Sequence, residues 1–234
     1  MTLDNINLLR TLLLLTPYFC LYLYYKKYVA DSFFIKARSE VQILFMIYGT
    51  AIIFIELMSW SFIFPESKFM NFKSFENDAT ATGVIIGAGA AIVGWLFTTR
   101  AQCINSNKSH AFQILMESRF SDEYSKNLVL TTKLYKDTKI AENVRDPVLS
   151  WEKYENLTYE QQDSINYMLN FFEFIAVGIR CGDLDEKLLH SSLKGIINTN
   201  YEFYRIIIET KQKDHQLALS NLVHLVQRWK RIQL

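Results

Sequence analysis

The sequence has few of the residues that define fibrous, disordered or disulfide-stabilised chains. Its 234 residues include three cysteines, three prolines and eight glycines. A disulfide scaffold, a collagen-like chain and a disordered tail all need a different composition. The 25 Lys and Arg residues nearly balance the 24 Asp and Glu residues, so the net charge of +1 gives no overall signature of nucleic-acid binding. What remains is a chain that is 50% hydrophobic, of the membrane or globular class.

Motifs of known catalytic chemistry are also missing. The sequence has no HExxH pair, no nucleophile elbow and no P-loop, and Cys103 and Cys181 lack the paired spacing of metal or disulfide sites. No zinc-type pairing involves the four histidines, which are His110, His190, His215 and His224. Three acidic residues lie close together in the sequence: Asp183, Asp185 and Glu186. Helix capping explains them better than metal binding does, because acidic side chains are favoured in the first turn of a helix. We therefore expect a protein that is not an enzyme and binds no cofactor or metal.

Charge is spread unevenly along the chain. Only seven of the 25 basic residues and seven of the 24 acidic residues lie within residues 1–99. This part is membrane-like in composition, whereas residues 100–234 have the composition of an ordinary soluble domain. The sequence therefore predicts a transmembrane anchor at 1–99 and a cytosolic domain at 100–234.

Three apolar segments form the predicted anchor. Val41–Phe64 has 24 residues with Glu56 as its one charge, which suffices to cross a hydrocarbon core of about 30 Å. Thr82–Thr99 carries no charge over 18 residues and is rich in glycine and alanine, as membrane helices that pack closely are. Leu8–Tyr25 is long enough to span as well, although it contains Arg10. We predict a third spanning helix there, with a helix lying in the membrane interface as the alternative.

Basic residues orient the anchor. The loop Lys26–Glu40 carries four basic residues, whereas the loop Pro65–Ala79 carries two. Loops rich in Lys and Arg stay in the cytoplasm. We therefore expect a multi-pass protein of the bacterial inner membrane, with its N-terminus outside and everything after Arg100 in the cytoplasm.

Two features of the apolar segments are candidates for a role in the membrane. An acid deep in a span usually faces a protein interior or a water-filled path, so Glu56 either lines an ion path in a homo-oligomer or fixes the packing of neighbouring helices. Small residues let helices approach closely. We expect such a contact, with Val41–Phe64 or with a second copy, at a face that contains Gly83, Gly87 and Gly94.

Residues 100–234 follow a helical pattern nearly throughout, with no β-hairpin signal. The clearest helix has an N-cap at Thr158, with Gln161 three residues later, and ends at Gly182. Its apolar positions are spaced three and four apart: Ile165, Met168, Leu169, Phe172, Ile175, Ala176 and Ile179. The other helices are expected up to about Glu117, at Asp122–Asn143, from an N-cap at Asp183 as far as about Ile208, and at Asp214–Ile232. The predicted fold class is all-α: transmembrane helices followed by a cytosolic helical bundle.

Glu173 and Arg180 are the candidate partner-contact residues of the cytosolic domain. They lie two turns apart on one helix face, so they meet either a bound partner or each other through a neighbouring helix. A structural ion pair at the rim of the core is the simpler interpretation. The basic C-terminal stretch Gln227–Arg231 is explained by the helix dipole, and we expect no base-specific contact with nucleic acid.

The stretch Leu169–Glu186, LNFFEFIAVGIRCGDLDE, together with the Gly/Ala-rich span and Thr99–Gln102, resembles a large bacterial family. Members of that family are membrane-anchored proteins with a helical domain of unknown function. The likeness covers about Thr82–Glu209, and it implies an anchor with a helical domain and no catalytic residues. This chain departs from it in having further hydrophobic segments before Thr82.

A narrower likeness is to the small transmembrane effectors of retron antiphage systems. It rests on chain size, on the anchor layout and on an Asn/Lys/Ile-rich composition, and a third span departs from the two-helix pattern. It implies an abortive-infection effector that perturbs the inner membrane when its partner, a reverse transcriptase with its RNA–DNA hybrid, releases it. The alternative is a non-enzymatic sensor or scaffold in the membrane, whose cytosolic helices bind a protein partner.

Overall fold

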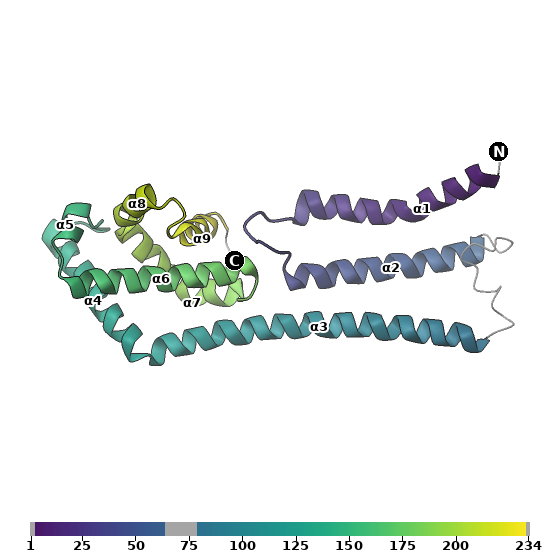
Figure 1. Cartoon of the computed structure of the whole chain (residues 1–234), viewed down its shortest axis with the longest axis horizontal. Coiled ribbons are helices and arrows are strands. Elements are labelled where there is room, and N and C mark those ends of the chain that lie inside the picture. Colours follow the sequence, from purple (N-terminus) through teal and green to yellow (C-terminus); the bar gives the residue numbers. More distant parts are fainter. Residues whose placement is uncertain (1–2, 64–78, 233–234) are drawn as a thin grey trace. The chain divides into compact units, whose positions relative to one another are not determined.

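The computed structural model describes residues 3–63 and 79–232, and within these residues every regular element is a helix (Figure 1). The described residues divide into two compact units. The first comprises those of 1–32 and 37–104, and the second comprises 33–36 together with those of 105–234. The all-helical fold class is therefore confirmed for the described residues. The predicted domain boundary at residue 99 compares with a division at 104, inside a continuous helix.

The first unit contains α1 (Leu3–Tyr24), the short π-helix η1 (Tyr25–Val29), α2 (Ser39–Ile63) and the beginning of α3 (Ala79–Phe120). Helices α1 and α2 pack against each other, and the rings of Tyr25 and Phe45 meet edge to face at 5.0 Å. Two stretches, Leu8–Val29 and Ser39–Ser59, are long and apolar enough to cross a membrane by length and composition.

The third predicted span, Thr82–Thr99, is helical as part of α3, but it is not one of these two stretches. The side chains of 81, 82 and 85 are not described, and neither are Phe64 and the residues 65–78 of the predicted outer loop. Spanning by this segment and the orientation of the anchor therefore stay predictions.

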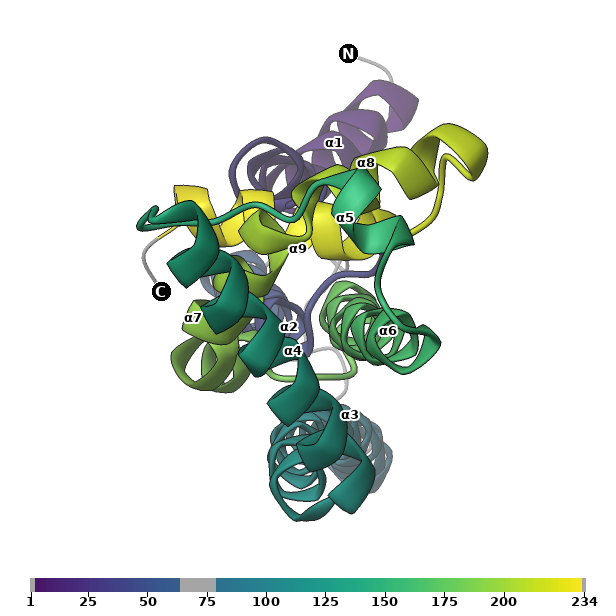
Figure 2. The same ribbon diagram turned by 90° about the vertical axis from the view of Figure 1, so that its left-hand side faces the viewer.

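The second unit is built around α6 (Tyr159–Cys181). Helix α6 packs against α4 (Asp122–Glu142) and α9 (Ser220–Arg231), and α9 also packs against α7 (Glu186–Phe203). In the view of Figure 2, α9 (yellow) runs above α6 and α7, both of which it contacts. Two shorter helices complete the unit, α5 (Trp151–Glu155) and α8 (Arg205–Asp214), which pack against each other. The end of α3 contributes buried Ala111 and Leu115 to the same core.

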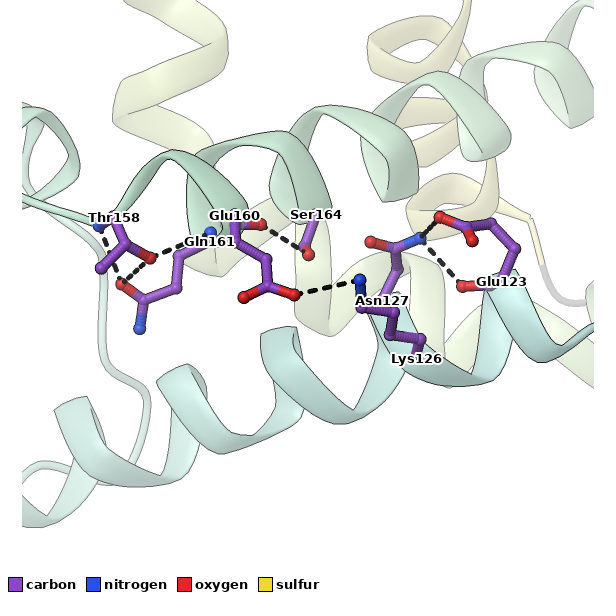
Figure 3. Close-up of polar contacts among 7 residues, drawn as sticks. All are labelled: Glu123, Lys126, Asn127, Thr158, Glu160, Gln161 and Ser164. Carbon is purple, nitrogen blue, oxygen red and sulfur yellow. Dashed lines mark hydrogen bonds and ion pairs between the residues drawn. The ribbon is translucent and has the colours of Figure 1, made fainter.

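Helix α6 forms as its sequence pattern predicts. Thr158 and Gln161 make a capping box, in which each side chain bonds the backbone N–H of the other residue (Figure 3). All seven residues of the predicted apolar stripe are buried. On the α4 side, Glu160 also pairs with Lys126 at 3.0 Å (Figure 3). Burial of one continuous stripe therefore positions α6 in the centre of the unit.

The predicted start of α7 is wrong by two residues. The N-cap is Asp185, whose carboxylate accepts the backbone N–H of Leu188 at 2.8 Å. Asp183 belongs instead to the turn that ends α6, where its N–H bonds Gly178 O at 2.9 Å, and its carboxylate contacts Lys36. Gly182 terminates α6 as predicted, with φ 71°.

The single helix predicted from Asp183 to Ile208 is also wrong, because the chain breaks between α7 and α8 at the wholly buried Tyr204. There Leu149 donates a backbone hydrogen bond of 2.8 Å to Phe203 O, an acceptor that a continuous helix would use internally. The last helix begins at Ser220 rather than Asp214, after Leu219 adopts φ 54°.

Gly178 generates the first prediction. A Cβ atom on Gly178 would lie 2.5 Å from Leu184 Cδ1, whereas one on Gly195 of α7 would meet nothing within 4 Å. Gly178→Ala should therefore lower the free energy of unfolding by about 1 to 3 kcal/mol, because Leu184 must leave its buried position. Gly195→Ala, the control, should raise it by up to about 1 kcal/mol through helix propensity. Thermal unfolding followed by circular dichroism measures both, and equal effects would contradict the tight contact.

Candidate functional site

Two segments of the chain attach to the C-terminal end of α6 where they enter the second unit. Between α1 and α2, the N–H of Ile35 donates to Arg180 O at 2.9 Å, and Lys36 Nζ contacts Asp183 Oδ1 at 2.8 Å. On α3, Asn107 Nδ2 donates to Gly182 O at 2.6 Å. The segments that follow the first apolar helix and the third therefore both attach within residues 180–183.

Gly182 makes these attachments available. In the left-handed conformation its N–H bonds the carbonyls of Gly178 and Ile179, and the N–H groups of Asp183 and Leu184 also bond Gly178 O. The last carbonyls of a helix have no partner within the helix. Here Ile35 bonds the Arg180 carbonyl and Asn107 bonds the Gly182 carbonyl, so these groups are satisfied by the incoming segments.

Arg180 joins the incoming segment to α9. Its Nε donates to Phe33 O at 3.1 Å and its Nη1 donates to Asn221 Oδ1 at 2.5 Å. Its guanidinium carbon also lies 5.8 Å from the centre of the Phe33 ring. One side chain of α6 thus contacts two segments that are far apart in the sequence.

Glu173 serves the beginning of α9. Its Oε1 accepts from the backbone N–H and the side-chain Nδ2 of Asn221 at 3.2 and 2.7 Å, and its Oε2 accepts from the N–H of Leu222 at 2.6 Å. The N-cap position of α9 is Leu219, which supplies no side-chain cap, so the Glu173 carboxylate bonds the unpaired N–H groups and the positive end of the helix dipole. Glu173 and Arg180 consequently meet at Asn221, and their contact with a partner stays a prediction.

A buried ion pair between Glu186 and Arg228 lies close to the end of α6. Arg228 of α9 donates from Nε to Glu186 Oε1 at 2.6 Å and from Nη2 to Glu186 Oε2 at 3.2 Å, and Trp229 Nε1 donates to the same carboxylate at 3.2 Å. Side-chain exposure is 15% for Arg228 and 5% for Glu186. The Arg228 guanidinium also lies over the rings of Phe33 and Phe34, at 4.7 and 4.9 Å from their centres. It therefore binds α7 and the incoming segment together.

His190 lies on α7, four residues after Glu186 of the ion pair. Its ring meets Trp229 edge to face at 5.2 Å. Burial, and next the charge of Lys194, lower the pKa of His190 below its ordinary value, so the neutral ring prevails at pH 7. The three acids for which helix capping is predicted have separate contacts: Asp183 with Lys36, Asp185 with the α7 backbone, and Glu186 with Arg228. Over the described part of the chain, no three His, Cys, Asp or Glu side chains converge as in a metal site.

The candidate residues of the apolar segments, Glu56, Gly83, Gly87 and Gly94, lie in the first unit. Tyr18 of α1 donates its hydroxyl to Glu56 Oε2 of α2 at 3.0 Å, which is the kind of interhelical contact that the packing interpretation of Glu56 predicts. A Cβ atom on Gly83, Gly87 or Gly94 would meet no described atom within 4 Å. Their contact with another helix stays a prediction, and any such contact would be with a second copy or with parts outside the description.

Sequence reasoning missed Phe33, Phe34 and Asn107, and it related Arg228 only to the helix dipole, whereas Arg228 pairs with Glu186. The available signal was an aromatic pair in a short connection between two apolar helices, a place where exposed rings are unfavourable in water. The two rings are half-buried and pack against the core of the second unit. Five residues of the stretch Leu169–Glu186 contact the incoming segments or α9: Glu173, Arg180, Gly182, Asp183 and Glu186.

The chain belongs to the family of a domain of unknown function, DUF4760, whose family model matches residues 82–229. No curated protein and no solved structure matches the chain. The family match concerns neither membrane anchoring nor retrons, so both likenesses drawn from the sequence stay predictions.

The ion pair generates the second prediction. Glu186→Gln should lower the free energy of unfolding by about 2 to 4 kcal/mol, because it leaves the charge of Arg228 without its buried partner. Glu160→Gln is the matched control, since the Lys126–Glu160 pair is 60% and 61% exposed and should give only a small change. Chemical denaturation measures both losses. Losses of equal size would show that the buried pair has no special weight.

Proposed function

We propose that this DUF4760 protein is a membrane effector, anchored by its apolar helices and controlled through its cytosolic helical unit. The apolar helices expose large side chains to the solvent, for example Leu13 at 57%, Phe54 at 61% and Trp95 at 67%. Water is an unfavourable environment for so large an apolar surface, whereas lipid covers it without cost. This exposure continues through the first part of α3 and supports a third span at Thr82–Thr99.

The observation that supports the anchored arrangement of the proposal is the membership of Phe33–Lys36 in the helical unit. A connection before α2 and a domain after α3 share one compact unit only when they lie on the same side of the membrane. The chain between them must then cross the membrane an even number of times. This supports α2 and the first part of α3 as a spanning hairpin, and the four basic residues of Lys26–Glu40 favour the cytoplasmic side. The N-terminus lies outside if α1 spans as well.

The bacterial antiphage setting of the proposal rests on the likeness to retron effectors. In that setting a reverse transcriptase with its RNA–DNA hybrid keeps the effector inactive, and its release lets the anchor assemble as a homo-oligomer and depolarise the membrane. The proposed role requires contact with lipid and with a protein, and no base-specific contact with nucleic acid. It also requires no catalytic residue and no cofactor.

The alternative function is a membrane-anchored sensor or scaffold. It is favoured by an open groove of about 270 Å³ between α4 and α7, whose walls include Leu128, Tyr135 and Ile196. A groove of this kind suits a side chain of a docked protein. Membrane potential separates the two functions, because a scaffold leaves it unchanged in every state.

Topology provides the third prediction. A reporter fused after Leu234 should behave as cytoplasmic, and one inserted near Asn71 should behave as external, because the two loops differ in basic residues and the helical unit includes Phe33–Lys36. A paired reporter that is active on only one side of the membrane measures this. A cytoplasmic reporter near Asn71 would contradict the spanning hairpin.

Depolarisation provides the fourth prediction. The released protein should depolarise bacterial cells, and Gly87→Leu should reduce both depolarisation and crosslinking between copies, since a leucine holds a neighbouring helix away. Gly89→Leu is the control, because two residues rotate the side chain to the opposite face of the helix. Potential-sensitive dyes and crosslinking in membranes give the two readouts. Unchanged potential with the released wild type would contradict the effector function and leave the scaffold.

Glu56 is tested in the same assay with two substitutions. Glu56→Leu removes both the carboxylate and its bond with Tyr18, whereas Tyr18→Phe removes the hydrogen bond and keeps the acid. Loss of depolarisation in Glu56→Leu alone would place the carboxylate in the ion path. Equal effects of both changes would assign Glu56 to helix packing.

A further inference from the structure

The segment Phe33–Lys36 is held by contacts that a separate peptide can reproduce. Its backbone accepts one hydrogen bond from Arg180 Nε and donates one to Arg180 O. Its two aromatic rings lie against the Arg228 guanidinium, and its lysine pairs with Asp183. We call the surface formed by Arg180, Asp183 and Arg228 the junction face. No covalent feature of the chain is needed to occupy it.

The junction face has an internal framework that does not depend on the segment. Arg228 is held in a fork by Glu186, which is itself bonded to Trp229. Arg180 is held by Asn221, and Asn221 by Glu173. Departure of the segment would therefore leave both guanidinium groups compensated and oriented, which is the condition for a preorganised binding surface.

The second half of the segment, Ile35 and Lys36, is largely exposed. It has no regular secondary structure, Ile35 is 69% exposed, and the side chains of Lys36 and Asp183 are 59% and 60% exposed. An ion pair so exposed adds little to stability. The aromatic rings against Arg228 and the two backbone hydrogen bonds with Arg180 therefore provide the main attachment.

We propose that the junction face is a peptide-binding site, and that a protein partner displaces Phe33–Lys36 with an extended segment of two aromatic residues followed, after one residue, by lysine. Flat guanidinium faces suit aromatic side chains. Asp183 selects a cation at the last position, and the carboxylate of Glu186 adjoins the arginine. These acids disfavour the phosphates of a nucleic acid, so a peptide is the favoured ligand. The inference goes beyond the proposed function and holds for an effector or a scaffold.

The test uses the full chain in lipid nanodiscs and a labelled peptide with the sequence of residues 31–38, DSFFIKAR. The wild-type segment competes with the peptide at high effective concentration. The double variant Phe33→Ala/Phe34→Ala should therefore bind the peptide at least tenfold more tightly than the wild type does. Adding Arg228→Lys, which keeps a positive charge opposite Glu186 but removes the flat face, should reverse that gain.

A second variant and a control peptide test the same site independently. Lys36→Glu places two acids opposite each other and weakens the segment without removing a ring, so it should raise peptide affinity in the same direction. The peptide DSAAIKAR should not bind any variant. Equal affinity of DSFFIKAR for the wild type and both segment variants would overturn the proposal. So would binding that survives Arg228→Lys, or an RNA oligonucleotide that binds the junction face and is not displaced by DSFFIKAR.

Discussion

The turn at Gly182 is the constraint on which the described helical unit depends. Its φ of 71° lets the chain reverse at the end of α6, so that Asp183 and Leu184 return to Gly178 O. A side chain at Gly182 would strain that backbone. The same turn presents the carbonyls of Arg180 and Gly182 to Ile35 and Asn107. One left-handed residue thus ends the central helix and creates the attachment for both incoming segments.

Local patterns predicted much of the fold and less of the site. The capping box at Thr158, the buried stripe of α6 and the end at Gly182 follow from patterns within one helix, so the sequence is sufficient to predict them. The break at Tyr204 depends on a backbone hydrogen bond from Leu149, which lies 54 residues before Phe203, its acceptor. No local pattern carries that information.

The site illustrates the same limit. Glu173 and Arg180 were identified from their shared face, but Asn221, where they meet, lies on another helix. The roles of Phe33 and Arg228 depend on a contact between residues almost 200 positions apart in the sequence. From the sequence alone, Lys36 indicates only which side of the membrane its loop occupies, whereas in the structure it also pairs with Asp183. Lys36 is consistent with both roles, since a loop that stays in the cytoplasm is also free to join a cytosolic domain.

The central claim is that Phe33–Lys36 and the end of α6 belong to one unit in the membrane-bound protein. Its most direct measurement is crosslinking in native membranes of a chain with Cys20, Cys103 and Cys181 changed to serine. Lys36→Cys/Asp183→Cys should join through a short bifunctional maleimide, because these side chains touch. Lys36→Cys/Glu160→Cys should not, since Glu160 lies in the first turn of α6, about 30 Å from the C-terminal end of that helix at 1.5 Å per residue. No crosslink in the first pair, or equal crosslinking in both, would contradict the account.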